Sequence, residues 1–271
     1  MRKIRAIART PAFRGSLAAL VLGLALAMAG CPGKKSDSTY SIGFNFHVIA
    51  MDENRADAVS RINTMVDEVK RLFLPEKFEI DSVEIYYYSD ESAQRLTNID
   101  IYRDEDNNGW PDDMEELLTW SGRTPNQNID IFLVKSFGDI GILGAAGNIP
   151  GPAKKGTKRS GVILNTLGGL YQMSPSELNL QGGTLAHESV HYLGVYHTTE
   201  REGRDFDYLK DTPECPQWTF DRNSDGLVSP NECFGQDAQY MMFWAAGNFA
   251  QDIISQEQTT VIRLHALVRK K

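Results

Sequence analysis

The sequence predicts an α+β, or mixed α/β, fold in which several strands precede a histidine-bearing helix. Three observations support this prediction. Stretches with the alternating or apolar patterns of strands lie between residues 40 and 165. Apolar residues recur at spacings of three and four after the first strand and near the C-terminus, as in helices. A long stretch with neither pattern separates the histidine-bearing helix from the last one.

The strand patterns are short. Strands are expected at residues 40–49, 82–88, 129–134 and 161–165. The glycine-rich stretch 142–149 is expected to be an extended segment at a sheet edge. About 230 residues beyond the N-terminal segment are enough for one domain with a sizeable core.

Three helices are predicted. The first follows Asp52 as N-cap and continues to about residue 73, with apolar residues at positions 59, 62, 66, 69 and 73. The second, at about 182–193, carries the histidines. The third covers 255–268, with Ser255 as its N-cap and Ile262 and Leu267 at apolar positions.

Residues 1–30 have the features of an export signal. A basic segment precedes the apolar run 17–29, whose 13 residues fall short of the roughly 20 needed to span a bilayer. The stretch Met28-Ala29-Gly30-Cys31 resembles the bacterial lipobox, whose cysteine is lipidated and becomes the new N-terminus. The alternative is an ordinary secretory signal that leaves Cys31 free.

The lipobox resemblance implies a lipid-anchored protein of the bacterial cell envelope, outside the cytoplasm. Residues 31–39 would then be a tether and residues 40–271 the folded domain. Pro32 and Gly33 do not resemble an inner-membrane retention signal, which favours the outer membrane or cell surface.

The charge of the chain limits its partners. Removing residues 1–30 takes away five basic residues and changes the formal net charge from −8 to −13. A chain this acidic lacks the basic surface that nucleic acid requires. We therefore expect no nucleic acid, and membrane contact through the lipid anchor only. We also expect a monomer.

The two remaining cysteines are Cys215 and Cys233. In an oxidising compartment outside the cytoplasm, we expect them to form a disulfide that closes a 19-residue loop. The alternative is a pair of free, buried thiols.

The stretch HESVHYLGVYH, residues 187–197, has the composition of a zinc site. His187 and His191 are four residues apart, so both face one side of a helix, and Glu188 can reach a water on the same ion. Gly194 can end the helix in a left-handed conformation and let His197 return as a third ligand. Three protein ligands and an open position describe one catalytic Zn²⁺.

Two less specific interpretations remain. The histidines could be ordinary residues of an amphipathic helix, or the site could bind zinc without catalysis. Glu188 argues against the second, because a structural zinc site needs no carboxylate at that position. His47 and His265 lack metal-ligand spacing and are expected to be ordinary surface or core histidines.

These residues resemble the metzincin metallopeptidases, whose signature H-E-x-x-H-x-x-G-x-x-H is matched at every fixed position from 187 to 197. The resemblance implies a twisted mixed sheet with a backing helix and an active-site helix. It also implies an N-terminal subdomain at 40–197 and an irregular C-terminal subdomain at 198–271 that ends in a helix.

The family also has a methionine turn beneath the zinc. Met242 is the better candidate for it and Met241 the alternative. The stretch GVYHTTE is similar to the pappalysin-like branch. Trp244 departs from that branch, where a tyrosine in this position can assist the zinc site.

Two twelve-residue stretches match the EF-hand calcium loop, each with glycine at position 6. In each loop, ligands are expected at positions 1, 3, 5, 9 and 12, with a backbone carbonyl at position 7. The expected ligands are Asp221, Asn223, Asp225, Leu227, Ser229 and Glu232 in one loop and Asp104, Asp106, Asn108, Trp110, Asp112 and Glu115 in the other. Flanking helices are not evident around 221–232, so one or two structural Ca²⁺ ions are expected. The alternative is a pair of acidic turns.

The preferred function is a zinc endopeptidase that acts on peptides or proteins. A bound zinc ion would lower the pKa of a water, and Glu188 would take the proton of that water and later deliver it to the leaving amine. The stretch 138–151 is expected to form the upper edge of the cleft and to pair with an extended substrate, or else to be a flexible loop. The alternative function is a calcium-dependent surface binding lipoprotein with a non-catalytic zinc site.

Overall fold

The structure is a computed structural model that describes residues 38–271 except 52–54 and 139–140. The expected signal segment, Cys31, most of the tether and the expected cap Asp52 lie outside the described residues. Among the described residues, no helix has the length and apolar character needed to cross a membrane.

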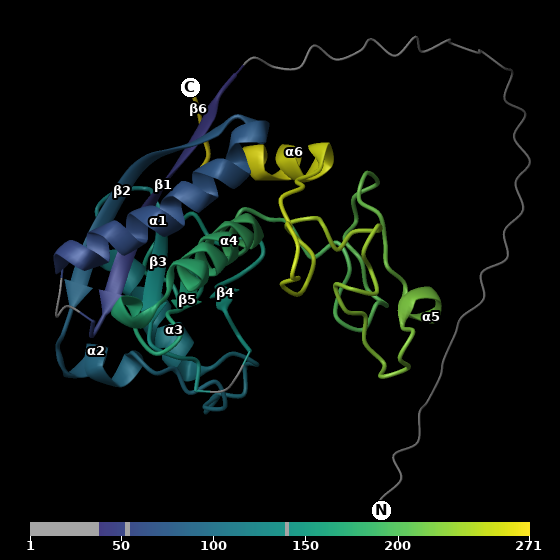
Figure 1. Cartoon of the computed structure of the whole chain (residues 1–271). Coiled ribbons are helices and arrows are strands. Elements are labelled where there is room, and N and C mark those ends of the chain that lie inside the picture. Colours follow the sequence, from purple (N-terminus) through teal and green to yellow (C-terminus); the bar gives the residue numbers. More distant parts are fainter. Residues whose placement is uncertain (1–37, 52–54, 139–140) are drawn as a thin grey trace, which may run out of the picture. The chain divides into compact units, whose positions relative to one another are not determined.

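A mixed sheet organises the fold (Figure 1). Its order is β2 (Phe78–Tyr88), β1 (Tyr40–Ile49), β3 (Ile129–Val134), β5 (Val162–Asn165) and β4 (Gly144–Ala146). The first four strands are parallel, and β4 pairs antiparallel with β5 at the edge. A short last strand, β6 (Arg269–Lys270), pairs antiparallel with the start of β1.

The two faces of the sheet are buried under different helices. Helices α1 (Arg55–Phe73) and α4 (Pro175–Tyr192) cover one face, and α2 (Glu91–Leu96) and α3 (Asp112–Thr119) cover the other (Figure 1). Side chains alternate accordingly along β3. Ile131 and Leu133 join the core under α1 and α4, and Phe132 and Val134 join the other core.

Helix α4 is defined by strong local signals. Ser174 caps its N-terminus in a capping box with Glu177, and Pro175 occupies the first turn, where its missing N–H costs nothing.

Three short 3₁₀ turns occur elsewhere, at Leu74–Glu76, Trp120–Arg123 and Leu170–Gln172.

Beyond α4 the chain is mostly irregular, with α5 (Gln217–Phe220) and α6 (Gln256–Leu264) as its helices among the described residues. The predicted disulfide is confirmed, with the Cα atoms of Cys215 and Cys233 5.7 Å apart. It lies in a small separate core with Val228, Ala238 and Phe243. Covalent closure compensates for the small apolar area of this part.

Several predicted boundaries are corrected. Strand β2 begins at Phe78, before residue 82, and the edge strand has only three residues. Helix α4 begins seven residues before position 182, because its capping box lies at Ser174. The last helix ends at Leu264, so the chain closes with β6 and not with a helix.

Two further corrections concern side chains and missed helices. Val59 is 43% exposed, whereas the other four predicted apolar positions of α1 are buried. Ala58 takes the place of Val59 in the buried stripe. Helices α2, α3 and α5 were not predicted, since each has eight residues or fewer and offers little periodicity. The one-turn α5 directly precedes the 221–232 loop, where no helix was expected.

A buried polar cluster lies on the α3 side of the sheet. His47 is fully buried and stacks on Tyr86, Tyr88 and Phe132. Its Nε2 lies 2.8 Å from Asp130 Oδ1. Burial lowers the pKa of His47 below 6.5, although the Asp130 carboxylate opposes this shift; the more distant charges of Lys155 and Arg123 add to the lowering.

His47 should make folding sensitive to mild acid. Because its pKa is lower in the folded state, the unfolded chain binds the extra proton as pH falls through about 6.5. The free energy of unfolding should therefore drop by up to about 1.4 kcal/mol per pH unit from this group. Urea denaturation of wild type and His47→Gln between pH 7.5 and 5.5 checks this, and equal losses in both proteins would contradict it.

Candidate metal centre

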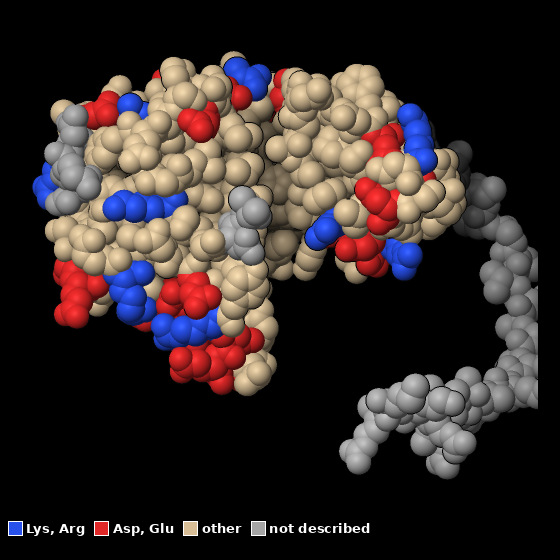
Figure 2. All heavy atoms as spheres, turned by 60° about the horizontal axis from the view of Figure 1, so that its bottom comes forward, with Lys and Arg blue, Asp and Glu red and all other residues tan. Residues whose placement is uncertain are grey.

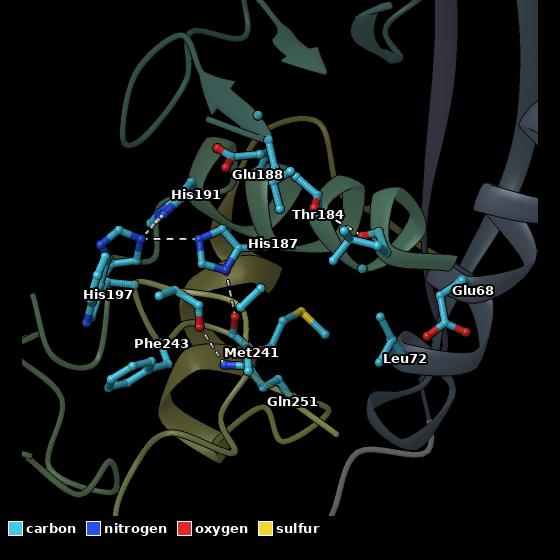
Figure 3. A pocket seen from close by; sticks show the side chains of 18 of the residues that line it. Glu68, Leu72, Thr184, His187, Glu188, His191, His197, Met241, Phe243 and Gln251 are labelled. Atoms are coloured by element: carbon cyan, nitrogen blue, oxygen red, sulfur yellow. Dashed lines mark hydrogen bonds between the residues drawn. The ribbon is translucent and has the colours of Figure 1, made fainter. Parts of the chain in front are cut away.

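Three imidazoles converge at the C-terminal end of α4 (Figure 3). His187 and His191 come from one face of the helix, and Gly194 turns the chain with a φ of 110° so that His197 folds back. The Nε2 atom of His197 lies 3.2 Å from that of His187 and 2.9 Å from that of His191. Nitrogen ligands of a tetrahedral zinc ion are about 3.3 Å apart, so the arrangement fits this metal.

The other ring nitrogen of each histidine has a partner that accepts a hydrogen bond. The Nδ1 atom of His187 lies 2.6 Å from the Met241 carbonyl oxygen, and that of His191 lies 2.7 Å from the Val195 carbonyl oxygen. A carbonyl oxygen only accepts, so both Nδ1 atoms carry the hydrogen and both Nε2 lone pairs face the centre.

Burial keeps the helical imidazoles neutral. Burial and the neighbouring His197 lower the pKa of His187 to about 4. Burial and the two other imidazoles lower the pKa of His191 well below 6.5. Neutral imidazole is the form that binds a metal ion, so the site is ready for one at ordinary pH.

Glu200 holds the third imidazole and was not predicted from the sequence. Its Oε2 atom lies 2.9 Å from His197 Nδ1. The hydrogen bond lowers the pKa of Glu200, with burial opposing. The only sequence signal is a carboxylate three residues after His197, which alone does not distinguish a partner from a surface residue.

Glu188 lies between the helix and the edge strand. A Cβ added at Gly144 would be 2.8 Å from Glu188 Cγ, so glycine is what allows β4 to approach α4. Burial raises the pKa of Glu188 to about 8, and a hydrogen bond from the Ala146 backbone partly opposes this rise.

The histidines and Glu188 line a cavity of about 810 Å³. Strand β4 and Ile149 form one side, and the segment from Met241 to Gln251 forms the other. Figure 2 shows a hollow near the middle of the molecule's face, surrounded mainly by uncharged side chains. Of the predicted upper edge, residues 138–151, the residues from Gly141 to Ala146 and Ile149 line the cavity.

The two candidates for the methionine turn, Met241 and Met242, lie in different surroundings. Met241 lines the cavity and gives its carbonyl to His187. Met242 is fully buried, and its carbonyl accepts the Thr198 N–H at 2.9 Å. Trp244 also lines the cavity, and its indole N–H donates to the Val228 carbonyl at 2.8 Å.

The two predicted calcium loops share one backbone conformation. In each, the residue at position 4 has a positive φ, 55° at Asn107 and 59° at Ser224. In each, the side chain at position 1 accepts the N–H groups of positions 5 and 6, and the side chain at position 5 accepts that of position 7. The side chain at position 3 also accepts the N–H of position 5.

The loops differ at position 12. Glu232 accepts hydrogen bonds from its own loop, including the Arg222 N–H at 2.9 Å and the Ser229 N–H at 2.9 Å. Glu115 accepts one hydrogen bond from its own loop, from the Asn108 side-chain amide at 2.9 Å, and also pairs with Lys158 at 2.6 Å and Arg159 at 2.8 Å. A cation in the 104–115 loop would have to share Glu115 with these two side chains.

Comparisons with known proteins add little to this geometry. No protein-family profile matches the chain, and no curated protein sequence matches it. One solved structure that it is similar to is metalloproteinase-II from Bacteroides fragilis, with 14% identity and a TM-score of 0.41. The match covers 84% of this chain and 54% of the other, so this chain spans about half of that protein. Assignment of the site therefore depends on its own residues.

Proposed function

We propose that the protein is a zinc-dependent endopeptidase. The observation that carries this proposal is the convergence of three Nε2 atoms inside a large cavity, with Glu188 between them and the free edge of a sheet. A bound zinc ion would supply a Lewis acid that polarises the scissile carbonyl and lowers the pKa of a water.

Glu188 would act as general base and then as general acid. It would take a proton from the attacking water and pass it to the leaving amine. A nearby divalent cation favours the ionised carboxylate, which opposes the effect of burial on its pKa. The hydrogen bond from Ala146 would keep the carboxylate aimed into the cleft.

The substrate would bind as an extended strand beside β4. This strand pairs with β5 along one edge, and its residues line the cavity. An edge strand offers backbone N–H and C=O groups to an extended peptide, so backbone pairing can place a peptide bond near the histidines. Its three residues limit this pairing to a few hydrogen bonds.

We further propose export, a lipid anchor at Cys31 and structural calcium in both loops. The disulfide favours an oxidising compartment outside the cytoplasm. The shared conformation of the two loops favours calcium over simple acidic turns. The same observation supports the second candidate function, a calcium-dependent binding lipoprotein with a non-catalytic zinc site.

Glu188→Gln should separate the two candidates. Loss of the proton acceptor should lower kcat/KM for peptide cleavage by about 10²–10⁴-fold, while zinc content remains unchanged because the histidines are untouched. Cleavage of a peptide library by residues 32–271, with zinc analysis, measures both. Glu202→Gln, at an exposed position nearby, is the matched control. Phenanthroline should abolish cleavage and zinc should restore it; a fully active Glu188→Gln protein would disprove this role.

Glu200→Gln should weaken zinc binding. The amide can still accept from His197, but it lacks the charge that strengthens the hydrogen bond and the ligand, so zinc affinity should fall by about 10–100-fold. Competition with a chromophoric chelator measures this in the absence of substrate. Glu200→Ala should lower the affinity at least as far, and Glu202→Gln should leave it unchanged. Equal zinc affinities in all four proteins would show that Glu200 has no such role.

Calcium should raise the thermal stability. At a calcium concentration 100 times the Kd, each site that binds only the folded protein adds about 2.7 kcal/mol to the free energy of unfolding. Thermal melts with calcium and with a chelator measure the gain. Glu232→Gln should lose part of it, and Glu214→Gln, exposed and outside the loop, should keep it. Melts that do not respond to calcium would rule out both sites.

A further inference from the structure

The chain enters the fold between two lysines at one end of the sheet. On one side of β1, Tyr40 pairs with Lys270 of β6, and the Lys271 N–H donates to the Thr39 carbonyl at 2.9 Å. On the side of β2, the Tyr40 N–H donates to the Lys77 carbonyl at 2.9 Å. The Lys77 and Lys270 side chains are both exposed, so they flank the point at which β1 begins.

Two strongly exposed leucines lie at the same end. Leu74 is 73% exposed and Leu264 is 80% exposed. The neighbour of Leu264, Arg263, donates to the carbonyl of Glu76, which belongs to the 3₁₀ turn that contains Leu74. The Arg263 guanidinium also lies 4.8 Å from the centre of the Tyr40 ring. The 3₁₀ turn, the end of α6 and the start of β1 therefore form one surface.

We call Leu74, Lys77, Leu264 and Lys270 the entry surface. A single exposed leucine is common on proteins and needs no partner. Two leucines beside two lysines have the composition of a lipid contact, because leucine leaves water at the headgroup boundary while the lysine ammonium group stays among the headgroups.

The acidic residues of this end have partners. Arg269 Nη2 lies 2.6 Å from Asp81 Oδ1, and Lys271 pairs with Glu79. Glu76 accepts a hydrogen bond from a hydroxyl of α6 at 2.8 Å. The negative net charge of the chain is therefore balanced at this end, and it does not keep the entry surface away from phospholipid headgroups.

The proposed anchor keeps the entry surface close to the membrane. Cys31 precedes Ser38 by seven residues, and seven residues span at most about 25 Å when fully extended. Such a short tether gives the entry surface a high effective concentration at the lipid, so a weak contact is enough to be populated.

Helix α6 connects the entry surface with the metal centre. A Cβ added at Gly194 would lie 3.3 Å from Val261 Cγ1 of α6. Gly194 is the residue that turns the chain between His191 and His197. A lipid contact at the end of α6 would therefore hold the cleft at a defined orientation to the membrane.

We propose that the entry surface rests on the phospholipid membrane, with Leu74 and Leu264 in the headgroup region, and that this contact orients the cleft. The inference rests on the proposed lipid anchor and is independent of the peptidase activity. It extends the expected membrane contact from the anchor alone to four side chains of the folded domain.

The test uses the full-length lipidated protein in vesicles of phosphatidylcholine and phosphatidylglycerol. Leu74→Cys and Leu264→Cys each carry one environment-sensitive fluorophore. Tyr102→Cys, at a position that is 76% exposed, is the matched control. Tyr102 follows α2, which lies at the opposite end of β1 and β2 from β6 (Figure 1).

The label reaches only the introduced cysteine, because Cys31 is lipidated and Cys215 and Cys233 form the disulfide. Brominated phosphatidylcholine quenches fluorophores that touch the lipid. It should lower the emission at least about twofold at positions 74 and 264, and by less than about a fifth at position 102. Leu264→Ser should lessen the quenching at position 74, since both leucines hold the same surface to the lipid.

Flotation with vesicles tests the anchor separately. Wild type should float, and Cys31→Ser should not. A wild type that does not float would overturn the proposed anchor and this inference with it. A wild type that floats but shows equal quenching at all three positions would overturn the inference and leave the anchor standing. Thermal melts show that each labelled protein is folded, and either leucine position carries the test if the other label disturbs the fold.

Discussion

The packing of α4 between α1 and β4 determines where the candidate metal centre lies. On one side, Gly182 lets α4 approach Glu68 of α1 closely. On the other, Gly144 lets β4 approach Glu188 and Thr184. Because α1 and β4 hold α4 from two sides, the position of α4 alone brings His187 to the cavity that it lines. Larger residues at either glycine would shift α4 and the whole centre with it.

The third imidazole depends on the irregular part of the chain, because His197 lies beyond α4. Thr199 lies two residues after His197. Its hydroxyl donates a hydrogen bond to the buried Asp237 and accepts one from the Cys215 N–H at 3.0 Å. Cys215 is bonded to Cys233, so a covalent link anchors the segment that carries His197. This segment has little apolar core of its own, and the disulfide limits how far it can move.

Local signals in the sequence predict much of this structure. The alternation in residues 40–49 gives the bounds of β1, and the spacing from His187 to His197 brings the three imidazoles together. Features that depend on distant residues could not be predicted in the same way. The Met241 carbonyl reaches His187 from 54 positions away, and no side-chain pattern marks a backbone acceptor. The exposure of Val59 likewise follows from where α1 meets the sheet, not from its own periodicity.

Trp244 connects the cleft with the 221–232 loop. In the pappalysin-like branch, which this sequence resembles, a tyrosine occupies the position of Trp244. The indole of Trp244 cannot replace the tyrosine hydroxyl. The structure gives the indole another place: it lines the cavity and donates to Val228, which is position 8 of the loop. Ala245, Ala246 and Gly247, which also line the cavity, follow Trp244 directly in the chain. An ordered loop therefore restrains the cleft wall through this hydrogen bond, so cation binding there would bear on substrate fit as well as on stability.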